Sequence, residues 1–210
     1  MKLLSELKIY SILTLLLLHM GSCLPDRKPE SKTEIVSEIA LESDMLDQAM
    51  KEGGEIASQS QAIMGKQLKS AIKKGGPKYA IHFCQKSVYP ILDSLQNLHH
   101  AEIRRVSFKA RNPADHPSHI ESQILKIYEK EHNRSEVLLD RVQRIDDQYV
   151  LFTRPILIEN AICLKCHGKP EGDIAISTMD VLQSLYPNDR AVGYALSDLR
   201  GMWSIKLLKK

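Results

Sequence analysis

The sequence has little of what several common functions are built from. It contains four cysteines and one tryptophan among 210 residues, and only 5% of its residues are aromatic. Basic and acidic residues nearly balance, with a formal net charge of +3, so charge gives no case for a nucleic-acid partner. There is no internal repeat and no low-complexity tract. The length suits one domain with a real core.

The scarce cysteines include one motif with a defined chemistry. Covalent haem attachment requires a C-x-x-C-H spacing, which the chain has in Cys163-Leu164-Lys165-Cys166-His167. Each thiol can add to one vinyl group of the porphyrin, and the next side chain then lies under the ring, where its imidazole can bind iron. The motif predicts one covalent haem c, with thioethers at Cys163 and Cys166 and with His167 as an axial ligand.

A zinc knuckle and a redox dithiol also use a C-x-x-C pair. A zinc site would require a second Cys/His pair at similar spacing, and the sequence has none. A thioredoxin-like dithiol would want a βαβ setting with the motif opening a helix, whereas here the motif follows a predicted strand at residues 149–158 and precedes the turn Gly168-Lys169-Pro170. These two uses, and incidental cysteines, stay as alternatives to haem.

Thioether attachment takes place outside the cytoplasm in bacteria, so a haem interpretation requires an export signal. The chain begins with positive charge and a short apolar run at residues 9–18, which has the shape of a signal peptide and is too short for a confident membrane span. Cys23 follows small residues and resembles the lipidated first residue of a bacterial lipoprotein; ordinary cleavage or an uncleaved anchor are the alternatives. We expect a signal peptide at 1–22, a polar tether at 23–32 and a domain at 33–210, on the periplasmic side of a bacterial membrane.

Helical periodicity dominates the first half of the domain. Apolar residues recur at helical spacing in three stretches, residues 33–50, 56–72 and 78–98. After the second stretch, Lys73-Lys74-Gly75-Gly76-Pro77 has the basic last turn, glycine and proline that end a helix. Gly53-Gly54 either breaks the first stretch or lies inside a longer helix.

The second half of the domain favours a sheet. Residues 118–130 predict a helix, and Pro155 places its strand at an edge or a bulge. Extended segments are expected at residues 103–108, 149–158, 174–178 and, as a closing hairpin, 191–196 with 202–207. Helices first and an antiparallel sheet later argue for an α+β fold.

Cys84 is left without a partner once lipid and haem have taken the other cysteines. The helical pattern turns it inward with core residues, while His82 lies nearer the solvent face. A buried thiolate suits ferric iron and gives a low potential. The pattern alone leaves other second ligands open, namely His82, His116, His119 and the methionines. It also leaves Cys84 as a small core residue.

Five stretches, in order, resemble a PAS-like c-type haem domain long catalogued as a family of unknown function. They are residues 80–84, 105–113, 153–156, 163–168 and 186–194. The family occurs alone and as the sensing part of bacterial membrane kinases. The resemblance implies long N-terminal helices against a PAS-like antiparallel sheet, with haem held between them by His and Cys, so that Cys84 is the second axial ligand. We expect a stand-alone member, because the chain shows no kinase and no second transmembrane segment.

Two arginines within these stretches have two interpretations each. Arg111 or Arg154 can pair with haem propionates, since a guanidinium binds carboxylates well. Alternatively, the Arg111-Asn112-Pro113 sequence simply holds a loop.

A covalent haem with six ligands has no open position and can carry one electron and little else. The sequence therefore predicts an electron-transfer cytochrome, with an unknown redox partner. An enzyme such as a haem peroxidase would need an open iron position, which an inward Cys84 argues against. The main alternative is a redox or gas sensor: a thiolate bond weakens on reduction, so Cys84 would leave, CO or NO would bind, and a partner protein would carry the signal.

Overall fold

The computed structural model describes residues 32–209, with side chains from residue 40 onward. Its helices are α2 (Lys32–His99), the short 3-10 turn η1 (Pro113–Asp115), α3 (His119–Asn133), α4 (Ala161–His167) and α5 (Ile176–Leu185). Its strands are β1 (Glu102–Val106), β2 (Arg141–Arg144), β3 (Tyr149–Leu157) and β4 (Leu199–Leu208). The predicted signal peptide, the predicted lipidation site Cys23 and nearly all of the predicted tether lie outside the described residues. The chain divides into two compact units, Met1–Ile39 and Ala40–Lys210, and the second is discussed below.

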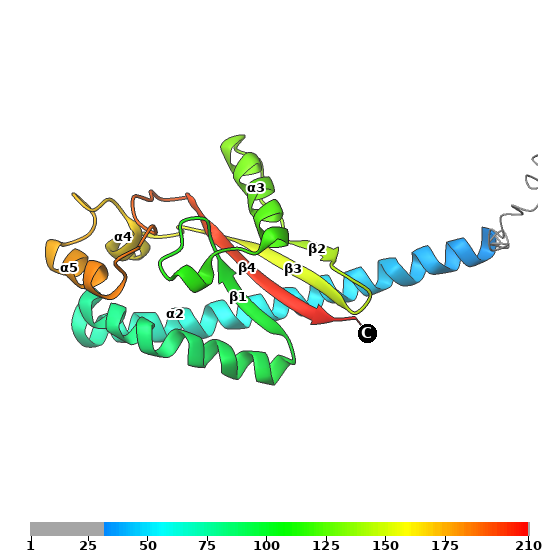
Figure 1. Ribbon diagram of the computed structural model, residues 1–210, viewed down its shortest axis with the longest axis horizontal. Helices are drawn as coiled ribbons and strands as arrows, with labels where there is room; N and C mark the ends of the chain where they lie inside the picture. Colours follow the sequence, from blue (N-terminus) through cyan, green and yellow to red (C-terminus); the bar gives the residue numbers. More distant parts are fainter. Residues whose placement is uncertain (1–31, 210) are drawn as a thin grey trace, which may run out of the picture. The chain divides into compact units, whose positions relative to one another are not determined.

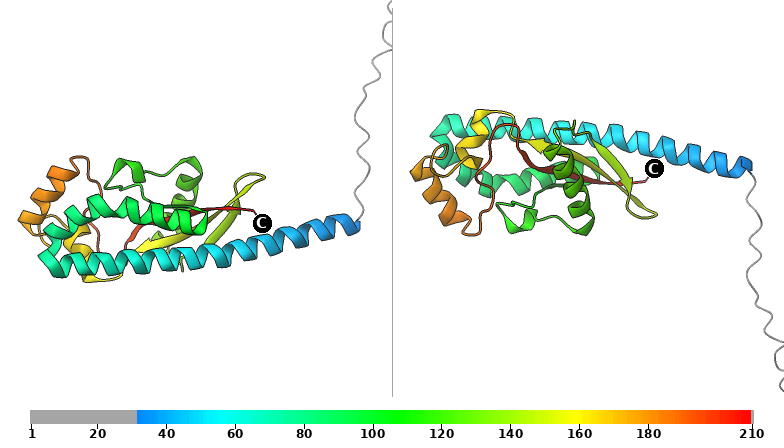
Figure 2. Two further views of the ribbon diagram at one scale, coloured as in Figure 1. Left: turned by 90° about the horizontal axis from the view of Figure 1, so that it is seen from below. Right: turned by 90° about the horizontal axis from the view of Figure 1, so that it is seen from above.

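Helix α2 folds back on itself at a pair of glycines. Gly75 has φ −157° and ψ 23°, and Gly76 has φ 72° and ψ −172°, a backbone region that side chains disfavour. Pro77 then begins the return, as the sequence predicts. We call residues 40–74 the first arm and residues 77–99 the second arm. Figures 1 and 2 show the two arms side by side.

The first arm runs through Gly53-Gly54 without a break, which settles the open point of the sequence. A Cβ atom on Gly53 would lie 2.2 Å from Cγ of Phe152 on β3. Gly53 therefore lets the helix and the sheet approach closely. This packing offsets the low helix propensity of glycine.

The four strands form one antiparallel sheet in the order β1-β4-β3-β2. Strand β4 pairs with β1 on one side and with β3 on the other, so the last strand in the sequence lies inside the sheet (Figure 1). Strand β3 lies inside the sheet, so the edge alternative for its proline is wrong. Pro155 lies beyond the part of β3 that pairs with β2 and just before a register shift at Ile156/Leu157, which agrees with the bulge alternative. The predicted α+β fold, with long N-terminal helices packed on an antiparallel sheet, is confirmed.

Two local expectations were wrong, and one strand was missed. Residues 191–196 form a loop, so the closing hairpin does not form, and β4 pairs with distant strands instead. The segment expected to be extended at 174–178 starts helix α5, because a short apolar run does not distinguish strand from helix. Strand β2 was not expected, since four half-exposed residues carry little pattern.

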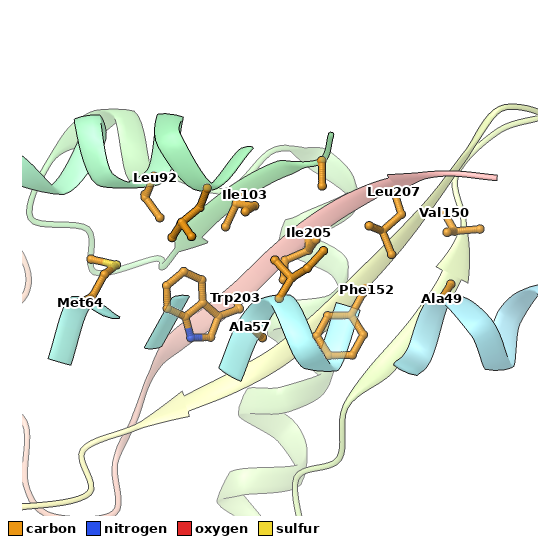
Figure 3. Close-up of a cluster of buried hydrophobic side chains, with 13 residues drawn as sticks. Ala49, Ala57, Met64, Leu92, Ile103, Val150, Phe152, Trp203, Ile205 and Leu207 are labelled. Carbon is orange, nitrogen blue, oxygen red and sulfur yellow. The ribbon is translucent and has the colours of Figure 1, made fainter. Parts of the chain in front are cut away.

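Two layers of side chains hold the sheet. On one face, buried residues of β3 and β4 pack against both arms of α2, with Phe152, Trp203 and Ile205 at the centre (Figure 3). On the other face, α3 packs Ile124, Leu125 and Tyr128 on the sheet, and the helix is started by a capping box at Ser118.

A third cluster joins the second arm to the two short helices. Ile81 packs with Ile174 and Leu182, and Cys166 contacts this group. This cluster places the C-x-x-C-H segment against the arm that carries Cys84. Among the described residues, no helix is long and apolar enough to cross a membrane.

Candidate functional site

The C-x-x-C-H motif lies on helix α4. Asn160 caps the start of this helix by accepting a hydrogen bond from the Ile162 amide, and Gly168 ends it. The helical conformation was not expected from the sequence. It places Cys163 and Cys166 three residues apart, on one face of the helix. The strands on either side, β3 and β4, are antiparallel neighbours, so the setting is not the βαβ unit of a thioredoxin-like dithiol.

His167 is held in one orientation and one tautomer. Its Nδ1 lies 2.7 Å from the carbonyl oxygen of Ala191, which can only accept, so Nδ1 carries the proton. The edge of the ring meets Tyr194, with centroids 6.3 Å apart. Burial, followed by the charges of Arg200 and Arg111, holds the pKa of His167 well below its usual value. The imidazole is therefore neutral, and the lone pair of Nε2 is available to a metal.

Cys84 lies on the second arm and faces the motif. Its thiol is half-buried, and its pKa is raised by burial against the lowering effect of the Arg105 and Arg111 charges. The charge of Cys84 in turn acts on Cys166, whose pKa is raised mainly by burial. The inward direction predicted for Cys84 is thus observed, although the side chain keeps some contact with solvent.

The other candidates for a second iron ligand are oriented differently. His82, His116 and His119 are exposed, as the sequence predicts for His82. His116 meets Phe108 edge-on, and His119 lies 3.1 Å from Gln123. Among these residues, Cys84 is the one that the structure brings to the motif.

Arg111 joins the motif to the loop that follows α5. Its Nε donates to Asp189 over 2.9 Å, and one Nη donates to the carbonyl oxygens of Cys166 and Ala191. Asp189 also accepts from the Ala191 amide. Arg111 therefore positions both the motif and the carbonyl group that orients His167, which agrees with the loop-holding interpretation. Contact with a propionate stays a prediction.

Arg154 is engaged in a different part of the fold. It forms a two-pronged ion pair with Asp140, and it donates to the Gly54 carbonyl and to Ser58 on the first arm. These bonds join β3 to α2. Its predicted contact with a propionate is not tested by this arrangement.

Sequence reasoning missed several charged groups near the motif. Arg105 on β1 and Arg200 on β4 both act on His167, and Arg200 lies over the ring of Tyr194. Asp115 accepts a hydrogen bond from Tyr89 over 3.0 Å and lies within electrostatic reach of Arg105. Arg105 lies in one of the five stretches that resemble the family, and this resemblance could have indicated its role. Arg200 lies in none of these stretches, so the sequence contains no comparable signal for it.

A pocket of about 290 Å³ opens between the Arg111–Pro113 segment and the C-terminal end of α5. It is lined by Gln85, Arg111, Asn112, Pro113, Leu185, Tyr186, Pro187 and Asn188. Among the described residues, no group of three or more His, Cys, Asp or Glu side chains is arranged to hold a metal ion.

Together these features define the class of the protein: an α+β domain in which a helical hairpin packs on an antiparallel sheet and presents a thiol to a C-x-x-C-H helix. The chain belongs to the Tll0287-like family, which it matches over residues 35–207.

A crystal structure of the cyanobacterial heme-protein Tll0287 is similar at 23% sequence identity. The match covers 86% of this chain and 98% of that one, with a TM-score of 0.49. No curated protein matches the chain.

Proposed function

We propose that this chain is a c-type cytochrome that binds one haem and transfers single electrons. The observation that carries the proposal is the pairing of a C-x-x-C-H helix with a thiol on the opposing arm. Haem would be held by thioethers to Cys163 and Cys166, and its iron would be ligated by His167 and Cys84. The cyanobacterial protein Tll0287 is a heme-protein, as this proposal expects of a relative.

The residues present fit such a group. A histidine that binds a metal usually donates its other ring nitrogen to a carbonyl or carboxylate, as His167 does to Ala191. Apolar side chains beside Cys166, among them Ile81, Ile174 and Leu182, can cover a porphyrin face. The Nε atoms of Arg105 and Arg200 are shielded and have no acceptor among the described residues, which suits a ligand with carboxylates.

Single-electron chemistry between Fe(III) and Fe(II) is what haem supplies when bound. The chain's contribution is to fix the ligands and to keep them in place. The Ala191 carbonyl keeps the Nε2 lone pair of His167 unprotonated. Arg111 holds the loop that carries this carbonyl. Cys84 as a thiolate would favour Fe(III) and lower the potential. We propose no catalytic residue, because His167 and Cys84 would both ligate the iron and leave no open position.

A sensor is the second candidate function, and one feature of the site favours it. Cys84 is half-buried and its neighbour Gln85 lines the pocket of about 290 Å³. A thiol that left the iron on reduction would free one coordination position, to which CO or NO could then bind. This mechanism would need a partner protein to carry the signal.

We also propose that the chain is exported and lipidated at Cys23, on the periplasmic side of a bacterial membrane. The support is the sequence pattern of residues 1–23, together with the fact that thioether attachment takes place outside the cytoplasm in bacteria.

Visible spectra test the ligand assignment. Cys84→Ala should convert ferric haem from low spin toward high spin, because the sixth ligand is lost. The matched control is His82→Ala, which removes an exposed alternative ligand two residues away and should leave the spectrum unchanged. An unchanged spectrum in Cys84→Ala, or a high-spin form in His82→Ala, would contradict ligation by Cys84.

Carbon monoxide separates the two functions. Wild-type protein reduced with dithionite should keep low-spin bands and show no shift with CO if it transfers electrons. A CO adduct formed only after reduction would favour sensing instead.

A further inference from the structure

Two arginines beside the candidate site form no ion pair within the described part of the chain. The side chain of Arg105 on β1 makes no hydrogen bond and no ion pair among these residues. Its guanidinium lies over the Trp203 ring, 5.7 Å from the centroid, and its Nε is shielded from solvent. Arg200 on β4 donates one Nη to the Lys109 carbonyl over 3.2 Å, while its own Nε is shielded and meets no acceptor in residues 40–209. Shielded guanidinium donors without acceptors are unfavourable, because the water they lose is not replaced.

The charges around the site show the same imbalance. Four cationic side chains stand near Cys84 and His167 against two carboxylates: Arg105, Arg111, Arg200 and Lys109 against Asp115 and Asp189. Asp189 is used by Arg111, and Asp115 is shared with the Tyr89 hydroxyl. Two positive charges therefore remain without a carboxylate, and Arg105 and Arg200 are the two of these four cations whose shielded Nε atoms lack an acceptor. A ligand with two carboxylates would balance it.

The sheet brings these two arginines together. Strands β1 and β4 are neighbours, and Arg105 lies opposite Trp203, three residues from Arg200. Between them, Gly201 has φ 158°, and a Cβ atom on it would lie 2.4 Å from the carbonyl oxygen of Val106. Glycine therefore permits the close approach of the two strand backbones at this point. Arg105 and Arg200 also lie within electrostatic reach of each other.

We propose that Arg105 and Arg200 bind the two propionate groups of the haem. This inference rests on the proposed function, since it requires haem at the Cys163–His167 helix. A guanidinium offers several N–H donors in a planar fork that matches a carboxylate. The unused donors favour this pair over Arg111 and Arg154, whose donors already reach Asp189 and Asp140.

The test uses the haem-loaded, full-length protein and a vibrational readout. Resonance Raman spectra contain a propionate bending band whose frequency follows hydrogen bonding to the propionate. Arg105→Gln and Arg200→Gln should each shift this band to lower frequency and lower the midpoint potential, because removing a nearby positive charge favours Fe(III). Arg105→Lys and Arg200→Lys keep the positive charge. Their midpoint potentials should therefore lie close to that of the wild type, while their propionate bands should lie between those of the wild type and the glutamine variants.

Arg190→Gln is the matched control. Arg190 lies in the same loop as Asp189 but is exposed, so the variant removes an equal charge and should leave the propionate band in place. Unshifted bands in the glutamine variants of Arg105 and Arg200 would overturn the assignment. Should a glutamine variant fail to fold, an unshifted band in its lysine counterpart overturns it equally. A wild-type chain whose mass contains no haem would instead contradict the proposed function.

Discussion

At the scale of single residues, backbone carbonyl groups organise the candidate site. The Ala191 oxygen accepts from both His167 and Arg111, so one atom sets the histidine tautomer and anchors the guanidinium. The Cys166 oxygen is bound by the same arginine. No sequence pattern predicts such contacts, because every residue has the same backbone carbonyl group.

Tyr128 is a buried hydroxyl away from the site and gives a prediction about alkaline stability. Tyr128 lies on α3 and is fully buried against the sheet, and its hydroxyl lies 3.1 Å from Thr153 Oγ1. Burial raises the pKa of Tyr128 from 10.0 to about 12. The unfolded chain therefore releases this proton first, and the folded protein should lose stability as the pH rises from 10 toward 12.

Urea unfolding of Tyr128→Phe measures this effect. The variant should be less stable by about 1 kcal/mol at neutral pH, because hydrogen bonds to Thr153 and to the Leu139 carbonyl are lost. It should also lose less stability above pH 10 than the wild type. Tyr149→Phe, whose hydroxyl makes no hydrogen bond in the described chain, is the control and should keep the wild-type alkaline loss. Equal alkaline losses in wild type and Tyr128→Phe would contradict the argument.

Among the site residues, the sequence could predict those with distinctive chemistry. The C-x-x-C-H spacing identified Cys163, Cys166 and His167 as one site, and helical periodicity turned Cys84 toward the core. Arg105 and Arg200 were missed because charged residues in short strands are normally solvent-facing. Only the folded chain shows that both lie within electrostatic reach of His167.

At the scale of elements, one glycine decides how closely the first arm approaches the sheet. Gly53→Ala should destabilise the protein by about 1–3 kcal/mol, because its Cβ would overlap the Phe152 ring and force the helix or the ring to move. Gly65 lies on the same arm, where an added Cβ would meet no described atom within 4 Å, so Gly65→Ala should stabilise the protein by about 0.5–1 kcal/mol. Urea unfolding of both variants tests the pair, and a Gly53→Ala protein as stable as wild type would refute the close approach.

Long periodic elements were predictable and short ones were not. Both arms, α3 and β3 follow from apolar spacing and from the glycines and proline at the turn. Helix α4 has seven residues, too few for a period to show, and α5 was mistaken for an extended segment. The hairpin expected at the end of the chain failed because β4 finds its partners in β1 and β3, far away in sequence.

At the scale of the domain, the candidate site is assembled from segments that are distant in the sequence. The second arm brings Cys84, α4 brings the motif, and β1 and β4 bring the two arginines. A cluster around Ile81 and Leu182 binds the second arm to α4 and α5. Composition and periodicity predicted the fold class, but they could not show which of these segments meet, because that depends on strand order and on the reversal at Gly76.

The central claim is that haem is joined covalently to Cys163 and Cys166. The most direct measurement is the mass of the exported full-length protein after denaturation, which removes any haem that is bound without a covalent link. The account predicts a gain of about 616 Da over the polypeptide and its acyl groups, as expected for one haem. The gain should disappear in a Cys163→Ala/Cys166→Ala double variant. A colourless exported chain with no such gain would contradict the account.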